Sequence, residues 1–380
     1  MHLRVKLCRI LRKVVHISPP RHPQSKPGRR CCLPNTTTIL GFILAGLSIR
    51  FWTPANPPPS PLPAHYEDAS RVIVVHDDQA TTTFTPQSQI VHSMVERGLS
   101  ALWNTPTPVL GWRTLISADD VVGLRIHSST GKTSGSRPEV VAALIESLLA
   151  SGHPAHKIIV WDRQLSSLRT AGYLSLRDRF GVRIAGARET GYDSDAYYES
   201  SIIGTLVWGD HEFGEKGEGI GRRSFVTRLL TEEITKIINV TPLLNHNRAG
   251  VYGNLVGLAL ASVDNTLRFK PDPGRLAIAV PEIIALPQIG DRIILNVVDA
   301  LIAQYQGEVQ ARLQDSSVLN ELRFSADPVA LDVLSIAELE KQRDLKGIET
   351  VEENRSLYEN ATLLQLGISD HNSIQIEFIQ

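Results

Sequence analysis

The sequence predicts an α/β fold, in which a mostly parallel mixed sheet is flanked by helices and preceded by an N-terminal leader or anchor. Three observations support this prediction. Short, β-branched apolar runs recur along the chain after residue 70. Segments with apolar residues at helical spacing separate the first of these runs. The region before residue 66 differs in composition from everything that follows.

The first 65 residues have the composition of a leader. Residues 1–30 contain many Lys and Arg but no Asp or Glu, and the apolar run Thr36–Ile49 follows them. The Pro-rich stretch 53–65 favours an extended linker. This order is typical of a secretory signal or signal-anchor, although the apolar run is shorter than the ~20 residues of a full membrane span. The alternative is a basic tail with a chance apolar patch.

We therefore expect export to the periplasm or cell envelope, or anchoring to a membrane through the N-terminal segment if it is not cleaved. Residues 66–380 are expected to form a single large α/β domain. The oligomeric state is not determined by the sequence.

Composition excludes some classes of function. The chain has 39 basic and 40 acidic residues, so no overall basic field predicts nucleic acid as a partner. The cysteines are Cys8, Cys31 and Cys32, and all three precede the expected domain. That domain can therefore form no internal disulfide and no Cys-ligated zinc or iron–sulfur site.

The first half of the domain predicts a βαβ unit. Residues 71–76, 120–127 and 157–162 are apolar, β-branched runs that predict strands. Residues 88–103 and 138–152 carry apolar stripes at helical spacing. In the second helix, Ser136 is a candidate N-cap, Pro138 suits the first turn and Gly152 suits the end. A strand, a helix and a strand at this spacing predict a parallel pair with a right-handed crossover.

The same alternation continues to the end of the chain. A helix is expected over 328–343, and the last strand is expected at an edge of the sheet. The remaining strands are expected at 181–187, 234–240, 292–298, 320–326 and 373–379.

The loop "HSSTGKTSGSRPEV" (127–140) contains a Gly-Lys-Thr triplet, which raises the question of a phosphate-binding P-loop. The P-loop spacing requires a Gly five positions before Gly131, and Ile126 stands there. Gly135, Ser136 and Arg137 also separate Lys132 from the expected helix. The sequence therefore predicts a polar strand-to-helix connection rather than a P-loop. Lys132 beside a helix N-terminus still makes this loop a candidate anion site.

Polar residues follow five of the predicted strands. Open α/β sheets bind ligands beyond the carboxyl ends of their strands, so these side chains could share one edge of the sheet. They are His127, Asp162, the Asn245-His246 pair, Asp299 and Asp327.

Several of these residues, and Asp332 after them, also have a structural alternative. Asp327 precedes Pro328 and could cap the helix that follows. Asp162 could end a turn, and Asp332, inside that helix, could simply be solvated. His127 could be a core histidine with satisfied hydrogen bonds. If the side chains do converge, His127, His246 and Asp299 are candidate ligands of a divalent metal. In that case His246 and Asp299 are also the candidate catalytic pair, with His246 as general base.

Three stretches of this sequence resemble the domain of unknown function 362 family. They are "VVGLRIHSSTGKTSGSRPEVVAALIESLLASGHPAHKIIVWDR", "INVTPLLNHNRAGVYGNLVGLALASVDNTLRF", and "ILNVVDALIAQYQG" followed by "FSADPVALDVLS". The resemblance covers residues 71–380 and implies the α/β fold and frequent export. The family has no established activity, so the resemblance implies a fold more than a function.

Residue by residue, the resemblance matches His246, Gly250, Asp299, Asp327, Pro328 and Asp332. Two positions depart from it. Arg125 stands where the family tends to have Lys, and Leu244 stands where Lys tends to come two positions before the central His. Iron–sulfur modules of some members cannot transfer to a domain without cysteine.

The functional expectation is an α/β protein that binds a small-molecule ligand at the carboxyl edge of its sheet, with a divalent metal as one candidate cofactor. Arg125 and Lys132 would hold a small anion. The remaining candidate ligand-binding residues are His127, Asp162, Asn245, Asp327 and Asp332. The protein would be either an enzyme or a non-catalytic binding protein of the cell envelope. The sequence contains no Gly-x-Ser-x-Gly elbow, so covalent catalysis by that route is not expected.

Overall fold

A computed structural model describes residues 69–380, with gaps at 201–218, 309 and 351–353. The predicted leader, including the apolar run Thr36–Ile49, lies outside the described residues. Among the residues that are described, no helix combines the length and apolar character needed to cross a bilayer.

Eight strands form a continuous sheet that includes both ends of the described chain. Its order is β13-β1-β12-β11-β9-β4-β5-β6, and the short strand β10 (Gly250–Val251) pairs with β9. The strands are β1 (Ser70–His76), β4 (Val122–Ile126), β5 (Ile158–Asp162), β6 (Arg183–Gly186), β9 (Lys236–His246), β11 (Ile293–Gln304), β12 (Ser316–Ser325) and β13 (Ile374–Ile379).

The sheet is mixed but mostly parallel, as predicted. Strands β11, β9, β4, β5 and β6 pair in parallel, and so do β1 and β13. Of the eight strands in this order, β12 runs the other way, antiparallel to both β1 and β11, and the short β10 is antiparallel to β9. The parallel half of the sheet therefore carries the strand ends at which a ligand site is expected.

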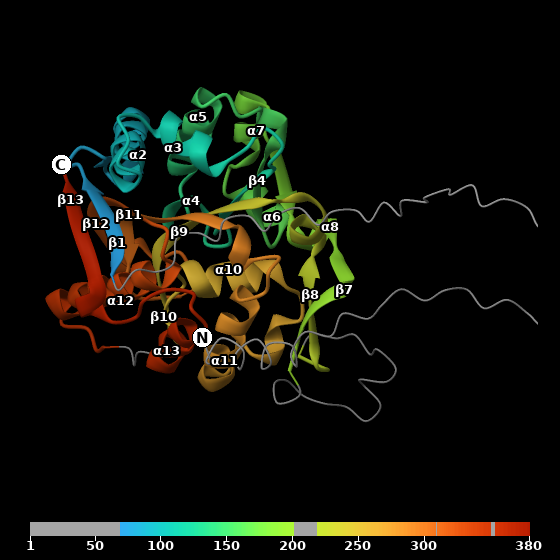
Figure 1. Cartoon of the computed structure of the whole chain (residues 1–380). Coiled ribbons are helices and arrows are strands. Elements are labelled where there is room, and N and C mark those ends of the chain that lie inside the picture. The colour runs from blue at the N-terminus through green and yellow to red at the C-terminus, as the bar shows by residue number, and fades with distance from the viewer. Residues whose placement is uncertain (1–68, 201–218, 309, 351–353) are drawn as a thin grey trace, which may run out of the picture.

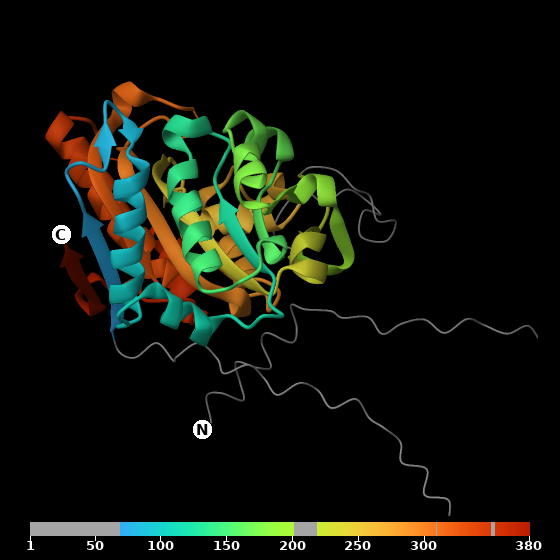
Figure 2. The same cartoon turned by 90° about the horizontal axis from the view of Figure 1, so that it is seen from above.

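Helices cover both faces of the sheet, which gives three layers (Figure 1; Figure 2 shows the same layers from above). We name the two faces after the helix that covers the centre of each, the α5 face and the α10 face. The α5 face packs against α2 (Ser88–Leu102), α3 (Pro108–Leu115), α5 (Pro138–Ala150), α6 (Leu165–Thr170) and α7 (Leu174–Phe180). The α10 face packs against α10 (Asn254–Ser262), α11 (Pro273–Ile284), α12 (Pro328–Lys346) and α13 (Arg355–Leu363).

Strand alternation decides which face each side chain joins. Leu124 and Ile126 of β4 lie in the core of the α5 face, so Gly123 and Arg125 point to the α10 face. In β11, Val297 and Leu301 lie in the α5-face core, and Val298 and Ala300 lie in the α10-face core.

The predicted strands and helices are all present, but β12 begins four residues earlier than expected, and two other strands continue past their expected ends. Strand β9 continues to His246 and β11 to Gln304, whereas the expected strands ended at 240 and 298. Polar residues inside these buried extensions interrupted the apolar pattern from which the ends were predicted. Asp299 is therefore an internal strand residue rather than the residue that follows a strand.

Candidate functional site

The site begins with Arg125 and His127, two residues apart at the end of β4. Their spacing puts both on the α10 face, and both are fully buried. A buried guanidinium is costly unless hydrogen bonds and an opposite charge compensate it. Among the described residues, no carboxylate pairs with Arg125, and none of its three side-chain nitrogens makes a hydrogen bond of good geometry. The Tyr252 hydroxyl is the side-chain group within reach of the guanidinium. Arg125 is thus a buried cation with unused donors.

The two residues beside Arg125 in the sheet also have buried polar atoms without a hydrogen-bond partner among the described residues. Arg125 is in register with Trp161 on β5 and with Asn239 on β9, and both are fully buried. The Trp161 Nε1 and the Asn239 Oδ1 also lack a hydrogen-bond partner within the described chain. Buried polar atoms are paired in the great majority of cases, so three unpaired neighbours on one face are a local exception.

Helix α10 leaves room for the guanidinium at a glycine. A Cβ placed on Gly257 would lie 2.5 Å from Nη1 of Arg125. Any other residue at this position would force the guanidinium to move. The helix and the arginine therefore meet at a contact that only glycine permits.

The ring of Tyr252 lies close to two imidazoles and to Arg125. Its ring centroid is 4.0 Å from that of His127 and 5.9 Å from that of His246, and the Arg125 Cζ lies 6.0 Å from the Tyr252 centroid. The β9–β10 hairpin brings Tyr252 there, because His246 pairs with Gly250 and the Tyr252 N–H donates to the carbonyl of Leu244. Burial raises the pKa of Tyr252 to about 12, against the opposing effect of Arg125, so its hydroxyl is neutral at pH 7.

Both imidazoles are neutral at pH 7. Burial lowers the pKa of His127 to about 3; Asp162 opposes this change and Arg125 adds to it. Burial likewise lowers the pKa of His246 to about 3, with further lowering by Lys270 and Arg248. Each ring can therefore offer one N–H donor and one nitrogen acceptor.

A carboxylate and a backbone amide flank His246. The Glu308 Oε1 lies 3.3 Å from its Nε2, and the Arg248 N–H donates to its Nδ1 at 3.4 Å. The carboxylate beside this imidazole is thus Glu308, not the predicted Asp299.

Cations outnumber carboxylates around these rings. Lys270 and Arg248 lie beside Glu308, and burial lowers the pKa of Lys270. Arg163 follows β5 and donates to the Thr266 hydroxyl at 2.7 Å. With Arg125 these make four cations, against the carboxylates of Asp162 and Glu308. The excess of positive charge favours an anion at this position.

Asp162 shapes the loop that carries His127. Its Oδ2 accepts hydrogen bonds from the backbone N–H and the hydroxyl of Ser128, at 2.8 and 2.6 Å. Its Oδ1 accepts the N–H of Arg163 at 2.7 Å. Asp162 therefore ties the end of β5 to the loop after β4, and its charge faces His127.

The Gly-Lys-Thr loop does not form a P-loop. Residues Gly131–Ser134 make a four-residue helix, α4, which the sequence did not predict, and α5 starts only at Pro138. The side chain of Lys132 is exposed and passes over Gly172, where a Cβ would lie 2.6 Å from its Cε. Lys132 consequently lies against α6–α7 instead of joining Arg125 and His127.

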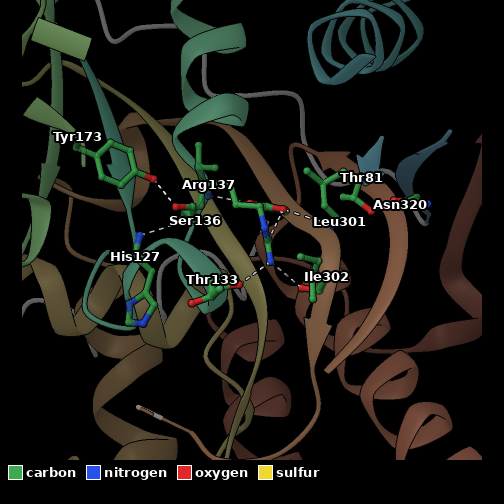
Figure 3. Close-up of polar contacts among 11 residues, drawn as sticks. Thr81, His127, Thr133, Ser136, Arg137, Tyr173, Leu301, Ile302 and Asn320 are labelled. Atoms are coloured by element: carbon green, nitrogen blue, oxygen red, sulfur yellow. Dashed lines mark hydrogen bonds and ion pairs between the residues drawn. The ribbon is translucent and has the colours of Figure 1, made fainter. Parts of the chain in front are cut away.

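Ser136 does not cap α5 as predicted. Its hydroxyl donates to the carbonyl of Val240 and accepts the N–H of His127, so it closes the loop onto the sheet (Figure 3). The N-cap position is Arg137, whose own side chain makes no capping bond. Its N–H donates to the Asp299 carboxylate at 2.8 Å. The anion at this helix N-terminus is therefore a residue of the protein itself.

Asp299 forms a buried ion pair with Arg137. Its Oδ1 lies 2.7 Å from the Arg137 Nη1, and both side chains are almost completely buried. Arg137 also donates to the carbonyls of Thr133 and Ile302 (Figure 3). Alternation along β11 puts Asp299 on the α5 face, whereas His127 lies on the α10 face. The structure therefore does not assemble the expected metal set of His127, His246 and Asp299. Among the described residues, no three His, Cys, Asp or Glu side chains form a metal-binding group.

Asp327 and Asp332 cap helices. Asp327 follows the reversed strand β12, so it lies away from the carboxyl ends of the parallel strands, and its Oδ1 accepts the N–H groups of Val329 and Ala330. Asp332 accepts the N–H groups of Asn254 and Leu255 at the start of α10, at 2.6 and 2.9 Å. Burial raises the pKa of Asp327 to about 6 and that of Asp332 to about 7, and these N–H groups oppose both shifts.

Asn245 also has a structural role. Its Oδ1 accepts a hydrogen bond from Nη2 of the buried Arg343 on α12, and its amide donates to Asn247 at 2.7 Å. It therefore joins the end of β9 to α12.

Of the predicted site residues, the structure brings together Arg125, His127, Asp162 and His246. Sequence reasoning missed Tyr252, Lys270 and Glu308, and it left Arg163, which directly follows Asp162, out of the candidate ligand-binding residues. Tyr252 and Arg163 each lie within a few residues of a predicted site residue, and the rule that ligands bind beyond strand ends could have included them. Lys270 and Glu308 carry no such signal, because they reach the site only through the packing of the loops after α10 and β11.

Comparisons with known proteins do not indicate a function for this chain. No protein-family model matches the chain, and no curated protein matches it. Among solved structures, it is similar to a crystal structure of a protein from Thermotoga maritima, at 12% identity and a TM-score of 0.35. The match covers 69% of this chain and 60% of that one.

Proposed function

We propose that this protein binds a small anionic ligand at the carboxyl ends of β4, β5 and β9, with Arg125 as its principal anchor. The observation that carries the proposal is the buried guanidinium of Arg125, which among the described residues has no carboxylate partner and only the Tyr252 hydroxyl named within reach. An uncompensated buried cation destabilises the folded chain by several kcal/mol. A carboxylate or phosphate oxygen placed against it supplies both the opposite charge and the missing acceptors.

The neighbouring groups support an anion rather than a cation. Tyr252 and the neutral imidazole of His127 can offer donors to a bound oxygen, and Lys270, Arg163 and Arg248 add positive charge at the half-buried rim. Asp162 and Glu308 already have partners in the protein. The ligand therefore approaches from the rim and reaches Arg125 past Tyr252.

Replacing Arg125 with methionine tests the proposal. We expect this variant to bind inorganic phosphate, sulfate and citrate about 100-fold more weakly than the wild type, measured by isothermal titration calorimetry. Without any anion it should be at least as stable as the wild type, because methionine removes a buried charge. The control is Arg177→Met, which changes an exposed arginine. The proposal fails if none of these anions binds the wild type, or if Arg125→Met binds them equally well.

Gly257→Ala tests the position of the guanidinium. The added Cβ would force Nη1 of Arg125 away from α10, so we expect about tenfold weaker phosphate binding. Stability should change by less than about 1 kcal/mol, because alanine favours the helix and the guanidinium is the flexible end of its side chain. Gly274→Ala, at an exposed glycine of α11, is the matched control and should bind phosphate like the wild type. Normal phosphate binding by Gly257→Ala would show that Arg125 does not act from its present position.

Catalysis is the second candidate, and the contact between His246 and Glu308 favours it. A carboxylate 3.3 Å from an imidazole nitrogen can orient the ring and stabilise its protonated form. An enzyme with this arrangement would deplete a compound from a metabolite extract, and His246→Ala would retain phosphate binding but lose that depletion. If the wild type depletes no compound, the protein is a binding protein without turnover.

The leader is a separate part of the proposal. Its basic stretch, apolar run and Pro-rich linker support export or tethering to a membrane. Residues 1–65 fused to alkaline phosphatase, which is active only after export, should give activity in intact bacterial cells. An inactive but well-expressed fusion would contradict this part without affecting the anion site.

A further inference from the structure

The two edges of the sheet differ in how well they are protected. One edge is β6, a strand of four residues. The other is β13, a strand of six residues that pairs with β1 on its inner side. No described strand pairs with the outer side of β13. An unprotected edge presents free N–H and C=O groups that can pair with another strand.

The apolar side chains of β13 are exposed on one face. Ile374 is buried in the α10-face core, whereas Ile376 is 42% exposed and Phe378 is 70% exposed on the same face. The strand contains no Lys and no Pro, the residues that commonly block edge pairing. Its single charge, Glu377, points to the other face, where it pairs with Arg71 at 2.5 Å.

The sequence of β13 is complementary to itself in one antiparallel register. With a twofold axis through Ile376 and perpendicular to the sheet, Ile376 faces Ile376 of the second copy, and Phe378 faces Ile374. On the opposite face Glu377 faces Gln375, so no like charges meet. A shift by one residue to an axis through Glu377 would put two carboxylates directly opposite each other, which is unfavourable.

We propose that β13 is a dimerisation edge, at which it pairs antiparallel with β13 of a second copy of this chain in the register centred on Ile376. The pairing joins two sheets into one and gives backbone partners to both outer edges. It also packs Ile376 and Phe378 of each copy against apolar side chains of the other. This inference is independent of the anion site, which lies in the parallel half of the sheet.

Cysteine cross-linking tests the register. In a full-length chain with Cys8, Cys31 and Cys32 changed to Ser, we expect Ile376→Cys to form a disulfide-linked dimer on mild oxidation, because facing Cβ atoms lie about 4.5–5.5 Å apart. The control is Leu363→Cys, an apolar α13 residue that is 72% exposed. It should cross-link about tenfold less, since random collision alone brings two copies of it together. Equal linking at both positions, or none at Ile376, overturns the proposal.

Sedimentation velocity of the full-length chain in a mild detergent tests the dimer itself. We expect a dimer for the wild type and for Leu363→Lys, and a monomer for Ile376→Lys and Phe378→Lys. Both lysines change exposed side chains, so a folded monomer is the expected state, which circular dichroism checks. A monomeric wild type, or dimers that persist in both β13 variants, would contradict the pairing.

Discussion

Acid will destabilise the wild-type protein more than a variant in which His127 and His246 are both glutamine. Burial lowers the pKa of each imidazole from 6.5 to about 3 in the folded chain. Between these two values the unfolded chain binds a proton at each histidine and the folded chain does not. The stability associated with the neutral rings is therefore complete above pH 6.5 and is lost as the pH falls.

The expected size is about 3 kcal/mol per imidazole between pH 8 and pH 4.5, from about 1.4 kcal/mol per pH unit. The raised pKa values of Asp327 and Asp332 act in the opposite direction, because the folded chain takes up their protons first as the pH falls. Both carboxyls remain in the variant, so the difference between the two proteins isolates the histidines.

Urea unfolding at a series of pH values from 8 to 4.5 measures this difference. His156→Gln changes an exposed imidazole and is the control; it should follow the wild type. If the double variant loses stability with falling pH as steeply as the wild type, the two rings are not buried in their neutral form.

Asp299→Ala will lower the free energy of unfolding by about 3–5 kcal/mol. The substitution leaves the buried guanidinium of Arg137 without its carboxylate and the Arg137 N–H, at the start of α5, without an acceptor. The effect is one of stability, because Asp299 and Arg137 lie on the face of the sheet opposite to Arg125 and His127. Phosphate binding by the folded fraction should therefore be unchanged.

Chemical denaturation of two further variants separates the pair from the general cost of a substitution. Asp178→Ala, which breaks the exposed pair with Arg177, should cost no more than about 1 kcal/mol. The double variant Asp299→Leu/Arg137→Met removes both charges and should recover part of the loss. A cost below about 1 kcal/mol for Asp299→Ala, or weaker phosphate binding by its folded fraction, would contradict this account.

Local sequence patterns determined the layout of the fold. Apolar runs such as 71–76 and 157–162 are strands because continuous β-branched runs suit a sheet covered on both faces. Pro328, directly after Asp327, marks the start of α12, and Gly152 lies just past the end of α5 with a φ of 93°. These signals act over a few residues, so they are present in the sequence itself.

The direction of a strand is not a local property. Asp327 was expected at the ligand edge because it follows a strand, yet β12 pairs antiparallel with both its neighbours and puts Asp327 elsewhere. The sequence of β12 suits either direction. Its neighbours in the sheet are distant in sequence and are decided by how the whole sheet assembles.

The sequence by itself determined the α/β class, most of its elements and the placement of Arg125 and His127 together at the end of β4, since a spacing of two residues on a strand puts both on one face. Only the tertiary structure decided that His246 and Tyr252 lie beside them and that Asp299 pairs with Arg137. It also decided that the charged groups of Lys270 and Glu308 lie near His246. The physical reason is that burial and charge partners arise from segments far apart in the chain. An isolated Arg, His or Asp carries no information on whether its partner is a ligand, a helix end or another side chain.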